Sequence, residues 1–308
     1  MTTLSETAST APIPPEPRRS RGPSAADAGM LLVCLIWGVN FSVMKLAIGQ
    51  IPALAFTAVR FALASLLLWA VLRATEGPAR LPRADTRRLY ALGIVGNTFY
   101  QLAFILGLAR TSATNSSLIL ATVPTVVALV AGAAGLERIT ARMWVGIVTG
   151  TVGVGLVIAT SGVEFSAGTL AGDLLTVLAV LCWAGYTVGL RRLPDGVSPL
   201  RVTTITNLAG TPGLLLVGLP GIVRLDWTSV PGSAWWALAY ATVLSLVVAY
   251  LLWNRSVQTV GGTRTAIYMC VTPLVAAGAA WVMLGEHARP LQAVGAALII
   301  AGVLLTRW

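Results

Sequence analysis

The chain has 308 residues, of which 56% are hydrophobic and only 10% are charged. Soluble domains usually carry about 25% charged residues, so this composition excludes an ordinary water-soluble domain and makes lipid the main solvent. The formal net charge of +10 does not indicate nucleic-acid binding, because the arginines stand in short connections between apolar runs, where they orient membrane helices. We therefore expect the lipid bilayer and a small molecule as partners, and no nucleic acid.

Residues 1–24 are rich in Ser, Thr and Pro, and this composition predicts a disordered tail that cannot bury a core. Beyond the tail, the apolar runs reach the length of about 20 residues that a helix needs to cross the hydrocarbon core. The helices predicted on this scale are 28–48, 53–73, 89–109, 113–133, 142–160, 172–191, 199–219, 234–254, 264–284 and 290–307. The sequence therefore predicts an all-α polytopic membrane protein with ten transmembrane helices.

The pattern Pro-x12-Glu-x8-Gly-x6-Gly occurs twice, with the second copy 149 residues after the first. The two copies are Pro124, Glu137, Gly146 and Gly153, and Pro273, Glu286, Gly295 and Gly302. Identical spacing at four positions indicates an internal duplication. We assign a five-helix repeat to residues 25–160, a connection to 161–171 and a second five-helix repeat to 172–308. Because five is odd, the second copy must cross the membrane upside down, and inverted repeats are typical of transporters.

The cationic side chains divide unevenly between the two sides of the predicted bundle. If the N-terminus is cytoplasmic, sixteen of the 21 Lys and Arg residues lie on that side and four on the other. The sixteen are Arg18, Arg19, Arg21, Arg73, Arg80, Arg83, Arg87, Arg88, Arg138, Arg142, Arg191, Arg192, Arg201, Arg255, Arg264 and Arg307; the four are Lys45, Arg110, Arg224 and Arg289. Cytoplasmic loops carry an excess of Lys and Arg, so both termini are predicted to be cytoplasmic. The chain has one Lys against twenty Arg and is rich in Ala and Gly. This usage is typical of a GC-rich bacterial genome, so we expect the protein in the inner membrane of a bacterium.

The stretch Trp37-Gly-Val-Asn-Phe41, followed by Pro52 and Arg60, resembles the opening of the EamA family. The duplicated Pro-Glu-Gly-Gly pattern also resembles that family, which belongs to the drug/metabolite transporter superfamily. The resemblance covers residues 28–307. It implies ten helices as two inverted five-helix repeats around a central cavity, and export of small metabolites, often amino acids or their derivatives. Some members of the superfamily move toxic cations or nucleotide sugars instead.

Arg60 lies about a third of the way into the second predicted helix. A charged side chain at depth in a membrane costs about 2.5–3.5 kcal/mol on insertion scales. No Asp or Glu stands in the middle of a predicted helix to pair with it, so Arg60 is a candidate for binding the carboxylate of a substrate. The alternative is that its long side chain reaches the membrane surface or bonds helix carbonyls. Its counterpart in the second repeat is Asn207, a neutral hydrogen-bonding residue.

Aromatic and amide side chains recur at helical spacing on several predicted helices. Trp and Tyr offer flat apolar surface with one hydrogen-bonding atom, which suits a solute that is part polar and part apolar. The substrate-binding candidates are Trp37, Asn40, Arg60, Tyr100, Gln101, Trp183, Tyr186, Asn207, Tyr250, Trp253 and Tyr268. For the aromatic and amide residues, helix packing and hydrogen bonding between helices are the alternative roles.

Pro124 and Pro273 fall inside predicted helices, where a proline removes a backbone hydrogen bond and kinks the helix. Matching kinks would suit alternating access, and static curvature is the alternative. Neither half shows a clear unwound stretch. Glu137 and Glu286 stand at helix ends, where we expect each to pair with an arginine or cap a neighbouring helix rather than carry protons. The repeated glycines are expected to pack helices closely within one subunit, with a homodimer seam as the alternative.

Motifs for catalysis are missing from the sequence. The chain has one His, at 287 in a predicted loop, and no Gly-x-Ser-x-Gly, His-Glu-x-x-His or Walker-type motif. We therefore predict no catalytic residue, no metal site and no cofactor. A secondary transporter is favoured over an intramembrane enzyme.

The expected activity is export of amino acids or related carboxylate-bearing metabolites, and export of cationic drugs such as quaternary ammonium compounds is the alternative. Proton relays usually use membrane-embedded Asp, Glu or His. Because the middle of every predicted helix lacks these residues, we expect uniport, exchange or weak proton coupling.

Overall fold

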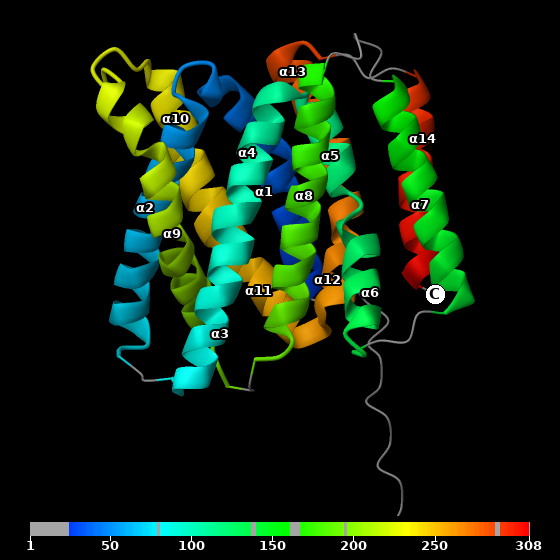
Figure 1. The fold of residues 1–308 in the computed structure, drawn as a ribbon, viewed down its shortest axis with the longest axis horizontal. Helices are drawn as coiled ribbons and strands as arrows, with labels where there is room; N and C mark the ends of the chain where they lie inside the picture. The colour runs from blue at the N-terminus through cyan, green and yellow to red at the C-terminus, as the bar shows by residue number, and fades with distance from the viewer. Residues whose placement is uncertain are drawn as a thin grey trace, which may run out of the picture.

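The computed structural model describes residues 25–78, 81–136, 140–160, 167–193, 196–286 and 290–307. Within these ranges the regular structure is helical and contains no strand. Figure 1 shows the helices side by side in a bundle, with connections gathered at its two ends. In the described part, seven helices are long and apolar enough to cross a membrane, beside the shorter apolar helices Thr272–Leu284 and Pro290–Gly302. The predicted all-α, polytopic membrane architecture is confirmed. The count of ten crossings and the inversion of the repeats stay predictions.

The helices follow the predicted apolar runs closely. The first half contains α1 (Ala25–Ile48), α2 (Ala53–Thr75), α3 (Arg83–Gly93), the π-helical segment η1 (Ile94–Phe99), α4 (Tyr100–Arg110), α5 (Ala113–Leu120), α6 (Val123–Ala133) and α7 (Ala141–Thr160). The second half contains α8 (Ala167–Leu190), α9 (Pro199–Arg224), α10 (Gly232–Tyr240), the π-helical segment η2 (Ala241–Val248), α11 (Ala249–Val260), α12 (Gly262–Ile267), the 3-10 turn η3 (Tyr268–Cys270), α13 (Thr272–Leu284) and α14 (Pro290–Arg307). The third predicted helix begins earlier than expected, at Arg83, because its first turns are polar and hydropathy does not detect them.

Two membrane helices are interrupted just before a proline. α5 ends at Leu120 before α6 begins, and α12 is followed by the single turn η3 before α13 begins. Pro124 and Pro273 stand in the first turn of α6 and α13, where the missing N–H of proline costs little. The predicted position inside a continuous helix is therefore wrong. The ring of a proline clashes with the carbonyl four residues earlier, so the chain ends one helix and starts another.

Two other helices contain a stretch of π-helix. The segment η1 joins α3 to α4, and η2 joins α10 to α11. The last residue of η2, Val248, stands 149 positions after Phe99, the last residue of η1. π-helical turns are rare and are frequent at functional sites. Both segments lie directly before residues predicted to bind substrate, Tyr100 and Gln101 in α4 and Tyr250 in α11.

The repeated glycines join α7 to α14. A Cβ atom added to Gly153 would lie 2.7 Å from the carbonyl oxygen of Gly295, and one added to Gly302 would lie 2.5 Å from that of Gly146. Only glycine allows two helix backbones to approach so closely. The glycine faces of these helices therefore meet inside one chain, as expected, and are not free to form the seam of a homodimer.

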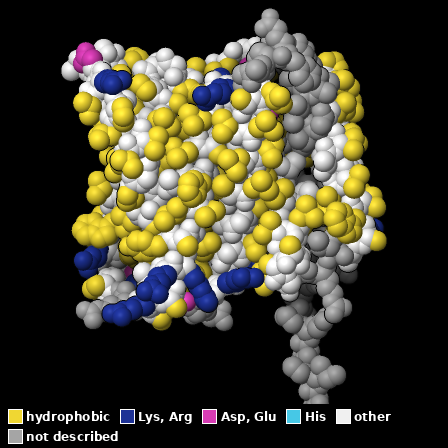
Figure 2. Space-filling model, viewed as in Figure 1, with side chains coloured by type: hydrophobic (Ala, Val, Ile, Leu, Met, Phe, Trp, Pro, Cys, Tyr) yellow, Lys and Arg dark blue, Asp and Glu magenta, His cyan; other side chains and the backbone are white. Residues whose placement is uncertain are grey.

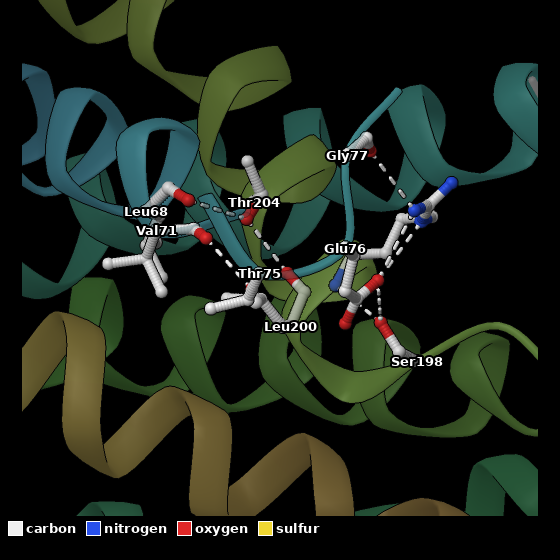
Figure 3. A network of polar contacts seen from close by, with 9 residues as sticks. Leu68, Val71, Thr75, Glu76, Gly77, Ser198, Leu200 and Thr204 are labelled. Atoms are coloured by element: carbon white, nitrogen blue, oxygen red, sulfur yellow. Dashed lines mark hydrogen bonds and ion pairs between the residues drawn. The ribbon is translucent and has the colours of Figure 1, made fainter. Parts of the chain in front are cut away.

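A second close pair, α2 and α9, joins the two halves along its length. Ser65 Oγ and Thr211 Oγ1 lie 2.8 Å apart within this pair. Figure 3 shows polar contacts where α2 ends, among them the hydrogen bond of 2.8 Å that Ser198 Oγ donates to Glu76. Arg201 forms an ion pair with the same carboxylate at 3.3 Å. Because this ion pair is only partly buried, it contributes little on its own. The extended packing of α2 on α9 therefore accounts for most of the contact.

The outer surface suits a membrane. Figure 2 shows apolar side chains (yellow) over the middle of one face, with Lys and Arg (dark blue) gathered mainly along its lower edge, where α3 begins. Side chains such as Val282 and Trp236 are each 78% exposed. Large apolar groups exposed in such numbers mark a surface that contacts lipid or another protein.

Of the two repeated glutamates, Glu286 caps a neighbouring helix. Glu286 accepts hydrogen bonds from the backbone N–H groups of Ala113 and Thr114, both at 3.3 Å, and from Thr114 Oγ1 at 2.8 Å. These contacts cap the first turn of α5, where the helix leaves N–H groups without internal partners. Its repeat mate Glu137 lies outside the described residues.

Candidate functional site

A cavity of about 30 Å³ lies in the middle of the bundle. Its lining comes from α1, α2, α4, α5, α8, η2, α11 and η3, and so from both halves of the chain. The lining residues are Trp37, Asn40, Phe41, Arg60, Tyr100, Gln101, Phe104, Leu120, Trp183, Ser245, Tyr250 and Met269. Ligand pockets usually measure about 300–1,000 Å³. The cavity therefore has room for water in this conformation, and a metabolite could enter only if the helices moved apart.

Arg60 is fully buried at this cavity, with 1% of its surface exposed. Its Nη2 donates to Gln101 Oε1, and Gln101 Nε2 donates in turn to the hydroxyl of Tyr250 over 3.2 Å. Its guanidinium carbon lies 5.8 Å from the ring centre of Phe56 and 5.6 Å from that of Phe61. Among the described residues, no carboxylate lies within ion-pairing distance of it. The alternative in which Arg60 reaches the membrane surface is therefore wrong.

Aromatic rings surround the cavity, with Trp183 at their centre. Its ring centre lies 5.6 Å from that of Trp37, 4.9 Å from Tyr100 and 5.4 Å from Tyr250. Edge-to-face and offset arrangements at such distances contribute about 0.5–1.5 kcal/mol each beyond the burial of the rings. The aromatic cluster therefore stabilises the conformation with the small cavity. It also offers a flat apolar surface to a solute.

Three buried polar atoms at the cavity have no hydrogen-bond partner. They are the acceptor Asn40 Oδ1 and the donors Arg60 Nε and Trp183 Nε1. By contrast, Trp37 Nε1 donates to the carbonyl oxygen of Ser245 over 3.1 Å. A buried polar atom without a partner costs about 1–3 kcal/mol. A solute that carries both an acceptor and a donor would offset part of that cost. These three atoms are therefore the candidates for hydrogen bonds to a solute.

Four of the predicted residues lie away from the cavity wall. Their side chains contact other parts of the bundle, although Trp253 still packs 5.4 Å from both Trp37 and Trp183. Tyr186 donates to Asn254 over 3.0 Å, and Asn207 donates to the carbonyl of Thr203 in its own helix, also over 3.0 Å. Tyr268 donates to a carboxylate oxygen of Asp27 at the start of α1. The structure thus brings Trp37, Asn40, Arg60, Tyr100, Gln101, Trp183 and Tyr250 together and leaves out Tyr186, Asn207, Trp253 and Tyr268.

Sequence reasoning did not select several lining residues. Leu120 and Met269 stand 149 positions apart, each at the interruption before a repeated proline. The repeated proline could have revealed them, because a helix that stops at the centre of a membrane usually does so beside a cavity. Ser245 also lines the cavity, and its backbone carbonyl accepts from Trp37, a contact for which the sequence carries no signal. Within the described ranges, no three His, Cys, Asp or Glu side chains gather as a metal site would need.

Comparisons with known proteins show the family of the chain. A model of the EamA-like transporter family matches residues 24–159 and, a second time, residues 170–308. The chain belongs to the EamA-like transporter family. This membership confirms the resemblance seen in the sequence, and it indicates a transporter rather than an enzyme.

Two relatives and a solved structure match most of the length of this chain. The chain is 30% identical to the uncharacterized transporter YyaM of Bacillus subtilis over 87% of this chain and 88% of that protein. It is 28% identical to a probable terminal-alkyne amino-acid exporter of Streptantibioticus cattleyicolor, over 92% of this chain and 93% of that one. A crystal structure superposes with a TM-score of 0.67 at 19% identity, covering 92% of this chain and 96% of the other. That last likeness concerns the fold alone.

Proposed function

We propose that this EamA-family protein is a secondary transporter that exports amino acids or related carboxylate-bearing metabolites. In this proposal it lies in the inner membrane of a bacterium, with both termini in the cytoplasm. Two inverted five-helix repeats alternate the access of the central cavity between the two sides. The transporter function follows from the family, and the substrate class rests on the chemistry of the cavity.

The observation that carries the substrate class is the state of Arg60. A guanidinium that is buried without a carboxylate partner bears most of the cost of leaving water. A substrate carboxylate could accept from its unpartnered Nε and from the nearby Trp183 Nε1. An ammonium group on the same solute would find the unpartnered acceptor Asn40 Oδ1. An amino acid carries both groups on one carbon atom, and the name of the exporter from Streptantibioticus cattleyicolor agrees with this chemistry.

Alternating access requires the cavity to open, and several features support it. The cavity is too small for a metabolite as it stands. The interruptions beside Leu120 and Met269, and the π-helical segments η1 and η2, occur at matching places in the two halves. Discontinuous helices at the level of a binding site are a recurrent feature of secondary transporters with inverted repeats. We infer that these four places are where the helices bend.

Export of a cationic drug is the second candidate, and the ring cluster is the observation in its favour. Trp37 and Trp183 line the cavity and pack against Trp253 behind it, and aromatic faces attract organic cations. Against it stands Arg60, because a buried guanidinium in the same wall would repel a second cation. We therefore rank this candidate below the carboxylate-bearing metabolites.

The test is flux through the purified protein in proteoliposomes. Labelled neutral amino acids and the organic cation tetraphenylphosphonium are offered separately to the wild type, to Arg60→Ala and to Arg224→Ala. Arg224 is the matched control, because it is an exposed arginine at the end of α9. We expect amino-acid flux in the wild type and in Arg224→Ala, and its loss in Arg60→Ala. Flux of the cation alone, or normal amino-acid flux in Arg60→Ala, would reverse the ranking.

A further inference from the structure

One carboxylate lies in the first turns of a membrane helix. The helix α8 begins at Ala167, ahead of the predicted start, so Asp173 stands in its second turn rather than at its end. The residue lies within the apolar span Leu170–Leu190 and only 6% of its surface is exposed. Ionisable residues within membrane spans are rare and mark functional sites by default. The expectation of uniport, exchange or weak proton coupling concerned acids in the middle of the helices, so it does not extend to an acid in the first turns of a helix.

The partners of Asp173 are neutral. Thr111 Oγ1 donates to Asp173 Oδ1 over 2.8 Å, and the side chain of Asn115 also forms a hydrogen bond with the carboxyl group. No Lys or Arg of the described ranges lies within ion-pairing distance. A threonine hydroxyl can donate or accept, and an asparagine amide offers both a donor and an acceptor. The same two side chains can therefore hold the group as a carboxylate or as a carboxylic acid.

The charged groups around Asp173 are engaged elsewhere. Lys45, on α1, donates to the carbonyl oxygens of Leu108 and Thr111 at 2.7 and 2.5 Å. Arg110, at the end of α4, donates to the carbonyl of Leu106 over 2.8 Å. Glu286 caps the first turn of α5, as described above.

The other elements packed on α8 add no charge near Asp173. The segments α5, α6 and η1 contain no Lys, Arg, Asp, Glu or His, while Arg255 of α11 and the arginines of α3 belong to the opposite end of the bundle. Residues 161–166 and 287–289 lie outside the described ranges. Within the described part, Asp173 is thus a buried acid without an ion pair, so no neighbouring cation fixes it as a carboxylate.

The contacts of Asp173 join the two halves of the chain. Asp173 belongs to the second half, whereas Thr111 lies in the connection between α4 and α5 and Asn115 in the first turn of α5, both in the first half. Lys45 and Glu286 hold the same connection from α1 and from the end of α13. This connection is therefore a point at which five helices, α1, α4, α5, α8 and α13, are tied together, and it lies at one end of the bundle (Figure 1, top).

We propose that Asp173 is a proton-binding site, and that its protonation loosens the connection between α4 and α5. The carboxylate takes up one proton from the water at this end of the bundle and becomes a neutral acid. A carboxylate only accepts hydrogen bonds, whereas the acid must donate one. Uptake of the proton therefore exchanges an accepted hydrogen bond for a donated one and weakens the charge-assisted contact with Thr111. Coupling of this event to export rests on the proposed function; the binding of the proton does not.

The equivalent place in the first half also holds an aspartate. Asp27 stands 146 positions before Asp173, the same spacing that separates Trp37 from Trp183. It accepts a hydrogen bond from Tyr268 at the opposite end of the bundle. An acid at each end would let a proton be taken up on one side and released on the other. The two ends differ in their partners, as the cavity differs between Arg60 and Asn207.

Proton binding is tested directly by infrared spectroscopy of the reconstituted protein. Difference spectra between alkaline and acidic buffer are recorded for the wild type, Asp173→Asn and Asp226→Asn. Asp226 is the matched control, since it is a solvent-exposed loop aspartate whose pKa is lowered by hydrogen bonds from the Thr228 hydroxyl and backbone N–H. We expect a carboxylic-acid band of the wild type to be missing from Asp173→Asn and retained in Asp226→Asn. Identical wild-type and Asp173→Asn spectra would overturn the proposal. Asp173→Glu, which restores an acid, serves if the asparagine variant does not fold.

The coupling is tested by transport of labelled neutral amino acids in the same proteoliposomes. We expect a pH gradient to drive wild-type flux severalfold above exchange without a gradient, and Asp173→Asn to retain the exchange and lose the stimulation. Equal stimulation in both proteins would overturn the coupling. If the wild type moves no amino acid at all, the proposed function fails, while the infrared result still decides whether Asp173 binds a proton.

Discussion

Gln101 donates a hydrogen bond of 3.2 Å to the hydroxyl of Tyr250, and the two residues stand 149 positions apart, at the same place in the two halves. Equivalent positions of a duplicated chain therefore meet at the centre of the bundle. They meet with different chemistry, because only Gln101 also accepts from the buried cation Arg60. The two halves thus contribute equivalent positions to the site, but the buried cation comes from the first half alone.

This relationship makes Gln101→Glu a sharp test of the carboxylate site. The new carboxylate would have nearly the shape of the amide and would pair with Arg60, as a substrate carboxylate is proposed to do. We expect the variant to fold with an unchanged or higher thermal midpoint in detergent and to lose amino-acid flux. Gln101→Leu removes the acceptor of Arg60 and should cost about 1.5–3 kcal/mol of stability. A Gln101→Glu protein that transports amino acids normally would contradict the proposal.

The glycine contact between α7 and α14 predicts a large effect of one methyl group. In Gly302→Ala the new Cβ would lie 2.5 Å from the carbonyl oxygen of Gly146, so the helices must separate. Overpacking of this kind costs about 1–3 kcal/mol, which thermal unfolding in detergent would reveal. Gly278→Ala is the control, because a Cβ there meets no atom within 4 Å. Equal midpoints for the two variants would show that the seam is not tight in the membrane.

Much of the fold could be predicted because hydropathy reports where a chain contacts lipid. The run from Ala53 to Arg73 is apolar almost throughout, and α2 covers it. The polar start of α3 was missed because Arg83–Arg88 are helical without being apolar. The interruptions before Pro124 and Pro273 were missed for another reason. A proline inside an apolar run can bend a helix or end it, and Pro212 lies within the uninterrupted α9.

The candidate site could be predicted in part. Arg60 is predicted because a charge is costly in lipid, and Trp37 and Trp183 because a flat apolar ring with one hydrogen-bonding atom suits a solute. All three line the cavity. Asn207 was selected as the counterpart of Arg60, yet it bonds to a carbonyl of its own helix. The direction in which a helix presents a residue depends on its rotation and tilt against its neighbours. Rotation and tilt are set by packing against residues far away in the sequence, so the pattern within one helix does not reveal them.

Two tryptophans at the cavity should respond differently to the same substitution. Trp37 Nε1 is bonded to the carbonyl of Ser245, whereas Trp183 Nε1 has no partner. We expect Trp37→Phe to lose about 1 kcal/mol from the broken hydrogen bond. Both variants also lose part of a packed ring, but Trp183→Phe breaks no hydrogen bond, since its donor has no partner, and it should weaken the apparent affinity for the amino acid. The comparison needs thermal unfolding and concentration-dependent flux of both variants. A loss of stability confined to Trp183→Phe would contradict this assignment of the indole donors.

The interruptions before the repeated prolines predict a slow step in transport. In Pro273→Ala the restored N–H could bond to the carbonyl of Met269 four residues earlier, so η3 and α13 could join into one regular helix. If the interruption is where the helix bends, a continuous helix should slow turnover while leaving binding of the amino acid nearly unchanged. Turnover is measured as initial flux at saturating substrate, and binding by quenching of tryptophan fluorescence.

Pro212→Ala is the matched control for this variant, because α9 continues through Pro212 without a break. An alanine there should raise helix stability and leave turnover as it was, since no interruption is removed. Turnover reduced equally in both variants would mean that the proline, rather than the interruption beside Met269, governs the rate. Turnover reduced in Pro273→Ala alone would locate the bend at the cavity wall, where Met269 and its counterpart Leu120 line the space that must widen.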